Sequence, residues 1–566
     1  MTRLQIFVRG LVQGVGFRPF VHRLATGAGL AGHVANTGDG VRIEIEGPSA
    51  LVRTFVRDLR LFAPPAASID SIETRSALPG LERSFEIRSS AGEGPLAPSL
   101  SPDLAPCPAC LAEVLSPTSR RRDYPFTSCA DCGPRWSIAT GLPWDRSRTT
   151  MAGFSLCAAC RAEYSDPADR RFHAEAIACP ACGPALELVD AAGFLLAPPG
   201  EALARATEAI LAGRILALRG VGGFQLLADA TAEEAIASLR SRKRRPSKPF
   251  AVLFASIAEV ELAAHPSPAE TAALGSPTAP IVLVARRPGP SGLAASVAPA
   301  TPLLGAMLPA SPLHHLLARR AGRPLVCTSG NRSDEPIAVD LPEALDRLGD
   351  VADLFLSHDR PIVRPLDDPV TRAGAVLRRA RGHAPRPLRV DRDLPPILAL
   401  GADEKNAVAI AVRREIVPSQ HLGDLDDPRA RRLQERTARE LVDLLQIRPE
   451  IVACDLHPDH ASTALAESLA TGWGVRLERV QHHHAHVAAV MAEHCLAGPV
   501  LGLAWDGTGF GPDGTVWGGE ALVVDGAGFR RIAHLAPFRL PGGEAARRAP
   551  RRVAASRLAA PGRPVD

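Results

Sequence analysis

Eight of the eleven cysteines repeat one spacing twice, a pattern that can bind metal ions. In each copy, two residues separate the members of a close pair and 18 residues separate the pairs. The first copy is Cys107, Cys110, Cys129 and Cys132, and the second, 50 residues further on, is Cys157, Cys160, Cys179 and Cys182. Two residues between thiols let a tight turn direct both sulfurs at one ion, and four thiolates complete a tetrahedral zinc shell. We therefore predict two structural zinc sites in an internally duplicated module.

Two alternatives concern this cysteine array. A disulfide framework uses the same residue type, but it needs an oxidising compartment, and we find no sequence feature that directs the chain to one. The spacing does not decide which pairs share an ion, because a crossed arrangement uses the same residues. Closed four-thiolate sites stabilise a fold, so the array locates a module without defining an activity.

A glycine loop near the N-terminus could bind phosphate. The segment VQGVGFR (12–18) places two glycines before a predicted helix over 18–30, with Arg18 at its end. Backbone N–H groups of such a loop bind phosphate, and a guanidinium adds a bidentate clamp. Asn36 ends a predicted strand, where its amide could orient an attacking water. The alternative is a plain tight turn with a surface arginine.

A second group of basic residues lies near small polar residues that could contact a nucleotide. The segment LRSRKRRPSKP (239–249) contains Lys243, Arg245 and Lys248. A solvated helix face is the alternative interpretation of such a charge run. However, TSGN (328–331) follows a predicted strand with small polar residues, where a nucleotide can approach the backbone. Further Arg and Asp residues occur in 358–372 and 378–388.

A histidine pair near the C-terminus could bind a metal ion. His482 and His486 lie four residues apart in a predicted helix, so their rings share one face. The next predicted strand ends in WDGTGFG (505–511), where Asp506 offers a carboxylate. Two histidines and a carboxylate with open positions suit iron or another divalent first-row metal. A chance cluster of polar histidines is the alternative.

The bulk composition limits the possible classes of protein. A chain of 566 residues should contain several domains, and its net charge of +4 is small. Because positive and negative side chains alternate without long single-sign runs, we expect no nucleic-acid partner. The first residues alternate as in a strand, and no apolar run approaches membrane-spanning length. We therefore expect a cytoplasmic protein with no membrane partner.

Linker-like stretches rich in Pro, Gly or small residues divide the chain into four predicted domains. The stretches are 91–106, 190–200 and 383–396. The first domain has two alternating strands and a third, FEIRS, with helical segments between them, which predicts a ferredoxin-like α+β sandwich. The third domain alternates short apolar strands with helices, which predicts an α/β fold with a largely parallel or mixed sheet. The fourth begins in the same way. The predicted domain ranges are 1–90, 91–195, 196–390 and 391–566.

The first domain resembles acylphosphatases over residues 3–90. The resemblance rests on the phosphate loop and on Asn36, and it implies hydrolysis of an acyl or carbamoyl phosphate. By this resemblance, Arg18 holds the phosphate and Asn36 places the attacking water. The matching loop residues are Gly14, Val15, Gly16, Phe17 and Arg18.

The third domain resembles the YrdC family, which makes carbamoyl-type adenylates from ATP, over residues 201–389. The resemblance implies that the cations Lys243, Arg245 and Lys248 neutralise the triphosphate of ATP bound with Mg²⁺. It places Ser329, Asn331 and Arg381 at the nucleotide. The chain departs from the usual family pattern at Pro369 and Ala380, each of which stands where a serine is frequent.

The fourth domain resembles the actin-like ATPase fold of the TsaD carbamoyltransferase family. The matching segments are GADEKN (401–406), QHLGDLDD (420–427) and DLHP (455–458). The resemblance implies that His482, His486 and Asp506 are metal ligands. The chain turns into an Arg, Ala and Pro-rich segment after residue 543, so we expect only the first lobe of this domain and a lost or weak transfer step.

The order of the four modules resembles the HypF family of carbamoyltransferases in [NiFe]-hydrogenase maturation. The resemblance implies hydrolysis of carbamoyl phosphate, formation of carbamoyl adenylate with release of pyrophosphate, and transfer of the carbamoyl group to the C-terminal cysteine of the partner HypE, where it becomes a cyanide ligand. Because carbamate decomposes in water, we expect an enclosed passage from the Arg18 site to the Lys243 site.

Three other classes of protein are alternatives to this carbamoyltransferase family. A carbamoyltransferase for a small-molecule hydroxyl shares the last two modules, but such enzymes usually lack the first two. A zinc scaffold without catalytic activity would bind ATP without turnover, and the departures at Pro369 and Ala380 leave this class open. A tRNA-modifying role fits less well, because the basic residues do not form a clear patch.

Overall fold

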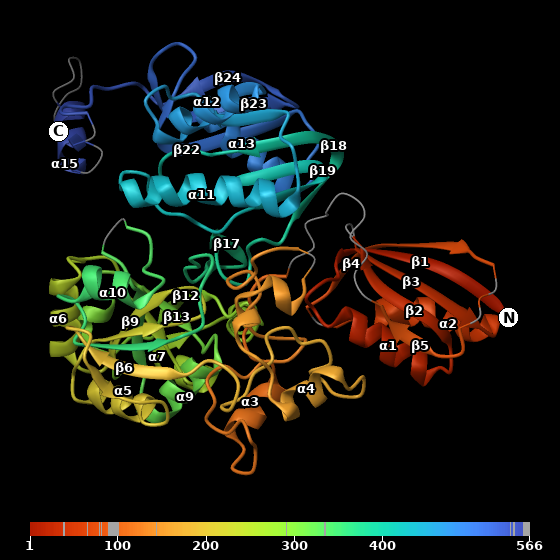
Figure 1. The fold of residues 1–566 in the computed structure, drawn as a ribbon. Coiled ribbons are helices and arrows are strands. Elements are labelled where there is room, and N and C mark those ends of the chain that lie inside the picture. Colours follow the sequence, from red (N-terminus) through yellow and green to blue (C-terminus); the bar gives the residue numbers. More distant parts are fainter. Residues whose placement is uncertain are drawn as a thin grey trace. The chain divides into compact units, whose positions relative to one another are not determined.

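The computed structural model describes most of the chain and divides it into two compact units (Figure 1). The described residues are 1–37, 40–64, 66–78, 80, 82–88, 101–142, 144–289, 291–332, 335–543, 545–546 and 549–558. Unit 1 comprises Met1–Pro387 and Val417–Ile447, and unit 2 comprises Leu388–Ile416 and Arg448–Asp566. Most of the predicted linker 91–106 lies outside the described residues.

The first domain of unit 1 is a five-stranded sheet with two helices against one face (Figure 1). The strand order is β4-β1-β3-β2-β5, and only the β2–β5 pair is parallel. Ile6 of β1 lies opposite Ile43 of β3, and both pack with Phe55 of α2 in one buried cluster. This arrangement confirms the predicted ferredoxin-like α+β fold. Its elements are β1 (Thr2–Leu11), α1 (Phe17–Gly27), β2 (Ala31–Thr37), β3 (Gly40–Gly47), α2 (Ser49–Leu61), β4 (Ser68–Ser76) and β5 (Phe85–Ile87).

The sequence pattern did not reveal strand β4. We expected FEIRS to close the sheet, but β5 is a short edge strand beside β2, whereas β4 pairs along most of β1. The β4 segment reads SIDSIETRS, and its positions are half-buried or exposed. Because an edge strand of this kind buries few side chains, it lacks the strong apolar alternation that identifies a strand from sequence.

The cysteine module consists of two similar halves, each built around one short helix. These helices are α3 (Pro108–Leu115) and α4 (Ala158–Ser165), and both begin directly after the first cysteine of their set. The second cysteine of each set therefore lies in the first helical turn, close to its partner. Two short 3₁₀ helices, η1 (Arg146–Arg148) and η2 (Thr150–Gly153), connect the halves.

The third domain contains a twelve-stranded mixed sheet, as predicted. Three strand pairs are parallel (β10–β13, β12–β16 and β8–β15), and the others are antiparallel. Its strands are β6 (Leu186–Asp190), β7 (Leu195–Ala197), β8 (Leu216–Arg219), β9 (Phe224–Asp229), β10 (Ala251–Leu253), β11 (Ala264–His265), β12 (Ile281–Arg286), β13 (Leu303–Met307), β14 (Leu325–Ser329), β15 (Leu354–His358), β16 (Val370–Arg372) and β17 (Ala375–Arg378). Its helices are α5 (Ala202–Leu211), α6 (Glu233–Arg242), α7 (Ile257–Ala263), α8 (Pro268–Leu274), α9 (Pro312–Ala321) and α10 (Leu341–Leu348), with the 3₁₀ helix η3 (Ala295–Val297).

Two stretches that we interpreted as linkers contain strands. Residues 190–200 include β7, which forms a hairpin with β6, and β6 pairs with β15 of the large sheet. Strand β18 (Leu388–Ala399) covers most of the stretch 383–396. Both stretches contain Pro or Gly. β7 is an edge strand, and the interior strand β18 has register irregularities between Arg389 and Ile397; both situations tolerate these residues, so composition alone was misleading.

Unit 2 has two separate sheets. The first has the order β19-β18-β20-β21, and the second has the order β22-β23-β24. The helix predicted around the histidine pair is α13 (His482–Glu493), which packs against β22. The remaining elements are β19 (Ala409–Pro418), β20 (Ile451–Asp455), α12 (Ala461–Trp473), β21 (Arg476–Val480), β22 (Val500–Phe510), β23 (Val516–Asp525), β24 (Gly528–His534) and α15 (Pro550–Leu558). Helix α11 (Pro428–Leu445), also predicted, is grouped with unit 1.

A helix that crosses a membrane must be both long and strongly apolar. None of the described helices meets both requirements.

Candidate active sites and metal centres

Each copy of the cysteine spacing forms its own four-thiol cluster, so the arrangement is not crossed. In the first cluster, neighbouring Sγ atoms lie 3.5–3.8 Å apart, and in the second the Cys179 Sγ lies 3.7 Å from the Sγ atoms of Cys157 and Cys182. Four sulfurs at about 2.3 Å from a zinc ion have separations of roughly 3.8 Å, so both clusters fit zinc. A disulfide needs a separation of about 2.05 Å, so the disulfide framework is excluded for these eight cysteines. The clusters are Cys107, Cys110, Cys129 and Cys132, and Cys157, Cys160, Cys179 and Cys182.

Arginines from each half of the module contact the thiol cluster of the other half. Arg120 and Arg121 of the first half reach the Cys160 Sγ at 3.4 Å. Arg170, 50 residues after Arg120, reaches the Cys110 Sγ at 2.9 Å. A zinc ion with four thiolates carries a net charge of −2, which a nearby guanidinium offsets. The two centres are therefore electrostatically linked through reciprocal contacts.

The predicted phosphate loop brings its residues together at the start of α1. Gly14 and Gly16 have φ angles of 69° and 72°, a left-handed conformation that favours glycine. Arg18 is buried, and with the Asn36 amide oriented to satisfy its neighbours, Asn36 Oδ1 accepts hydrogen bonds from Arg18 Nε at 3.2 Å and Nη2 at 3.3 Å. Val15 and Phe17 of the loop are buried in the domain core. This geometry leaves a concave loop beside a fixed guanidinium.

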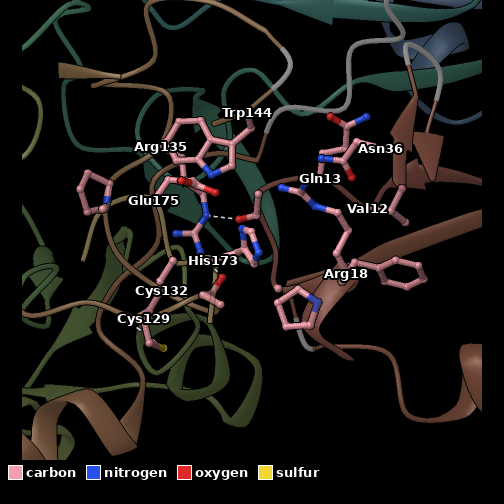
Figure 2. A pocket seen from close by; sticks show the side chains of 18 residues that line it. Val12, Gln13, Arg18, Asn36, Cys129, Cys132, Arg135, Trp144, His173 and Glu175 are labelled. Carbon is pink, nitrogen blue, oxygen red and sulfur yellow. Dashed lines mark hydrogen bonds between the residues drawn. The ribbon is translucent and has the colours of Figure 1, made fainter. Parts of the chain in front are cut away.

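The cysteine module forms the second wall of this pocket (Figure 2). Arg135 donates a hydrogen bond through Nε to the Gly14 carbonyl, and a Cβ on Gly14 would contact the Trp144 ring at 3.5 Å. Asp145 Oδ1 lies 3.8 Å from Arg18 Nη2. We did not predict this wall, because we interpreted the cysteine module as structural. Its residues follow the metal ligands in sequence, and no motif distinguishes them.

Glu175 is the most unusual group in the second wall. Its side chain is 2% exposed, and Oε2 accepts hydrogen bonds of 2.8 Å from the Tyr164 hydroxyl and the Arg146 backbone N–H. Its other oxygen, Oε1, is buried without a hydrogen-bond partner. Burial raises the pKa of Glu175 to about 7, although Tyr164 and Arg18 oppose this shift. Burial also lowers the pKa of His173, in the same wall, to about 4, so this imidazole is neutral at pH 7.

The predicted nucleotide-binding residues of the third domain meet at the end of α6. Lys243 is buried, and its Nζ donates hydrogen bonds to the Ser329 carbonyl at 2.7 Å and to Asn331 Oδ1 at 2.9 Å. Ser329 Oγ also donates to Asn331 Oδ1 at 2.7 Å. Burial, with a smaller contribution from Arg245, lowers the pKa of Lys243 to about 7. The structure therefore brings together Lys243, Ser329 and Asn331, although they are far apart in sequence.

The other cations of this group are placed differently. Arg245 is half-buried, donates to Thr328 Oγ1 at 3.1 Å and lies over the Phe250 ring. Lys248 is exposed. Arg381 is buried and binds Asp368 Oδ1 through Nη2 at 3.0 Å and the Ala279 carbonyl at 2.9 Å, so its guanidinium already has several partners.

A small pocket beside Ser329 contains polar residues that we did not predict. Gln225 donates to Asp368 Oδ2 at 2.5 Å, and its Oε1 lies 2.8 Å from His314 Nε2. Burial lowers the pKa of His314 to about 4, so its ring is neutral at pH 7. These residues and Arg381 line the pocket together. The signal was absent from the sequence because the residues belong to three different segments.

In unit 2, the predicted metal ligands converge on one point. Asp506 Oδ2 lies 2.9 Å from His482 Nε2 and 3.6 Å from His486 Nε2, and the two histidine nitrogens are 3.2 Å apart. Ligands at about 2.1 Å from a first-row metal ion are separated by roughly 3.0–3.4 Å, so these residues fit such an ion. The His486 side chain is exposed, so one side of the cluster is open to solvent. The buried Asp455, at the end of β20, accepts a hydrogen bond from His482 Nδ1 at 2.7 Å and thereby fixes the orientation of the imidazole ring.

Together, the fold and these sites define a multidomain α+β protein with a glycine loop beside a buried arginine, two four-cysteine clusters that fit zinc, a buried lysine beside Ser329 and Asn331, and a cluster of two histidines and an aspartate. Models of known families match the same regions. The acylphosphatase model matches residues 4–87, the HypF finger model matches 107–139 and 156–189, and the Sua5, YciO and YrdC model, described as telomere recombination, matches 208–380. The HypF Kae1-like domain model matches 392–493.

The chain belongs to the HypF family of carbamoyltransferases. It is 46% identical to the carbamoyltransferase HypF2 of Cupriavidus necator, over 99% of this chain and 72% of that protein. It is 47% identical to the carbamoyltransferase HypF of Rhizobium leguminosarum bv. viciae, over 100% of this chain and 73% of that protein. A crystal structure of full-length HypF in the phosphate- and nucleotide-bound form is 41% identical to this chain and has a TM-score of 0.93. The match covers 98% of this chain and 73% of that chain. The chain is therefore a carbamoyltransferase with an acylphosphatase domain.

One further match differs from our expectation of a single lobe in the last domain. A model described as the second subdomain of the Kae1-like carbamoyltransferase domain matches residues 502–564. This agrees with the separate antiparallel sheet of β22, β23 and β24. We missed the division because the His482 and Asp506 motifs, which lie close together in sequence, were assigned to one lobe.

Proposed function

We propose that the chain carries out the first two steps of carbamoyl activation in unit 1 and the transfer step in unit 2. The substrates are carbamoyl phosphate and ATP, and the acceptor is the C-terminal cysteine of HypE in [NiFe]-hydrogenase maturation. The observation that carries this proposal is the Arg18–Asn36 pair beside the left-handed glycines, because a buried guanidinium next to such a loop supports an acyl-phosphate site over a plain turn.

In the first step, water attacks the carbonyl carbon of carbamoyl phosphate. The C–O bond to phosphate breaks, which gives carbamate and inorganic phosphate. The loop N–H groups and Arg18 hold the phosphate and stabilise its charge as it leaves. Asn36 contacts Arg18 through its oxygen, so its NH₂ group remains to bind the carbonyl or the water.

In the second step, a carbamate oxygen attacks the α-phosphorus of ATP. This forms carbamoyl adenylate and releases pyrophosphate. Lys243, Arg245 and Lys248 would neutralise the triphosphate and the leaving pyrophosphate, and Ser329 and Asn331 would contact the nucleotide. Mg²⁺ bound to ATP would supply further positive charge. We propose that Arg381 acts mainly by positioning Asp368, since its guanidinium already binds that carboxylate.

In the third step, the cysteine thiolate of HypE attacks the carbamoyl carbon, and AMP leaves. His482, His486 and Asp506 would hold a divalent metal ion, with iron among the candidates, and Asp455 would fix the orientation of His482. Bound there, the ion would supply positive charge that stabilises negative charge on the transferring group.

Two further parts of the proposal concern where these reactions occur. Carbamate decomposes in water, so an enclosed passage between the Arg18 and Lys243 sites would limit its loss. The thiol clusters, which fit zinc and are not disulfides, support a reducing compartment such as the cytoplasm.

The proposal is tested by measuring AMP and pyrophosphate release from ATP by the purified chain, with and without carbamoyl phosphate. We expect release that requires carbamoyl phosphate and that is lost in Arg18→Ala. Zinc content and thermal unfolding of the variant show whether it is folded. ATP binding by a folded chain without any pyrophosphate release would contradict the proposal and would favour a binding protein without catalytic activity.

A further inference from the structure

The buried oxygen of Glu175 has no partner within the described protein, although it lines the pocket that contains Arg18 (Figure 2). A buried carboxylate oxygen without a hydrogen bond costs free energy, so such groups usually have a functional partner. The other oxygen of Glu175 already binds two donors, the Tyr164 hydroxyl and the Arg146 backbone N–H. The carboxylate is therefore held in one orientation and cannot satisfy Oε1 by turning.

The charge of the pocket indicates which part of a substrate meets Glu175. The phosphate loop and Arg18 on the first wall attract an anion, whereas the Glu175 carboxylate on the second wall repels one. The second wall also contains Arg135, but its guanidinium already donates hydrogen bonds to the backbone carbonyls of Gly14, Gly133 and Ala130. An acyl phosphate bound by its phosphate at Arg18 would therefore direct its acyl group, and not its phosphate, toward Glu175. The group that best satisfies Oε1 is an N–H donor.

We propose that Glu175 selects the carbamoyl group of the substrate by accepting a hydrogen bond from its NH₂. The acetyl group of acetyl phosphate has a methyl group at this place and leaves Oε1 unsatisfied. This inference rests on the proposed function, because it names how the acyl-phosphate site recognises its substrate. It assigns a substrate-recognition role to a residue of the zinc module.

The neighbours of Glu175 support the role of an acceptor. The ionisable groups around it are Arg18 from α1, Asp145 before η1, Arg146 of η1, Tyr164 from α4, His173 in its own segment and Arg135 in the same wall; the Arg146 guanidinium donates to the Glu175 backbone carbonyl at 2.6 Å. Arg18 and Tyr164 stabilise the carboxylate, whereas Asp145 and burial favour the protonated acid. The carboxylate should therefore predominate above about pH 7, where it can only accept hydrogen bonds.

The substitution Glu175→Gln replaces the acceptor oxygen Oε1 with an NH₂ group, which is a hydrogen-bond donor. The Tyr164 hydroxyl and the Arg146 N–H are donors, so the glutamine must place its oxygen toward them. Its NH₂ group then faces the pocket, where it opposes the NH₂ of a carbamoyl group. The steric volume is nearly unchanged, so a loss of packing does not explain an effect on selectivity.

The test is the ratio of kcat/KM for carbamoyl phosphate to kcat/KM for acetyl phosphate, measured by phosphate release at pH 8 with the full chain. We expect Glu175→Gln to lower this ratio by about 10-fold or more, the usual effect of an unpaired buried polar group. Glu208→Gln, on the exposed face of α5, is the matched control and should leave the ratio unchanged. An equal loss for both substrates, or no change, would overturn the inference.

The wild-type protein and a second variant separate the possible failures. If the wild-type chain hydrolyses neither substrate, the proposed function fails, whatever Glu175 does. If Glu175→Gln does not fold, Tyr164→Phe tests the same idea, because it keeps the carboxylate and removes one donor from Oε2. This donor lowers the pKa of Glu175, so its loss should raise that pKa. The ratio of the two kcat/KM values should then increase only at a higher pH than in the wild type. An unchanged pH profile in Tyr164→Phe would count against the inference.

Discussion

The Arg18 pocket and the Lys243 site both hold a buried cation, but they are built differently. The Arg18 pocket has one wall from the first domain and one from the zinc module, and a carboxylate oxygen in it has no partner. The Lys243 ammonium is surrounded by groups of its own domain, and it already binds the Ser329 carbonyl and Asn331. The first pocket is therefore completed by a neighbouring module, whereas the cation of the second site is held by groups of its own domain.

The largest effect should come from Arg18→Ala. Removing a guanidinium that holds the leaving phosphate should reduce phosphate release from carbamoyl phosphate by about 100-fold or more. Arg23→Ala, an exposed arginine on the same helix, is the control and should retain activity. A fully active Arg18→Ala would show that the pocket is not the hydrolytic site.

The next effect should come from Lys243→Met, which should separate the two sites. We expect pyrophosphate release to fall by about 100-fold, because charge on the leaving group is no longer offset. Phosphate release from carbamoyl phosphate should be unchanged, since Lys243 belongs to the second site. Arg244→Gln, which removes an exposed neighbouring charge, is the control. Parallel loss of both activities would break the distinction between the sites.

A smaller effect should follow from Cys160→Ser. The zinc stoichiometry, measured by elemental analysis, should fall from two ions toward one, and Arg120 and Arg121 should lose their thiolate partner. Because Trp144 and Glu175 belong to this module, KM for carbamoyl phosphate should rise by about 10-fold. ATP binding should change little. Equal damage to both sites would mean that the zinc module serves only general folding.

The smallest effect should be a pH dependence of ATP binding. Burial lowers the pKa of Lys243 to about 7, so the free protein loses this positive charge as the pH rises through 7. If bound triphosphate requires the ammonium form, Kd for ATP should increase by up to about tenfold per pH unit above 7. Titration calorimetry from pH 6 to 9 would measure this increase. The increase should be absent in Lys243→Met, and a flat wild-type profile would contradict the role of Lys243.

The sequence predicted the cationic half of each site better than its partners. Gly14, Arg18 and Asn36 form a local motif, and Lys243 stands out in a chain with few lysines, so both could be found without a structure. Glu175, Asp145 and Trp144 lie in a segment whose strongest signal is its cysteines. Their role depends on packing between modules, which no local pattern encodes. Gln225 and His314 were missed for a different reason: they come from separate segments of the third domain and meet only in the folded structure.

The fold was predicted well where burial produces strong periodicity. The mixed sheet, the ferredoxin-like sandwich and helix α1 followed from apolar patterns. Strands β4 and β7 did not, because these edge strands bury few side chains. The cysteine spacing also left open which pairs share an ion. The structure answers this question, because the four cysteines of each copy lie together in one cluster.

The most direct test of the account is rescue by carbamate. Pyrophosphate release from ATP would be measured in Arg18→Ala and in Lys243→Met, first with carbamoyl phosphate and then with ammonium bicarbonate, which contains carbamate at equilibrium. We predict that carbamate restores pyrophosphate release in Arg18→Ala but not in Lys243→Met. Failure of carbamate to restore release in a folded Arg18→Ala protein, or restoration in both variants, would contradict two successive sites.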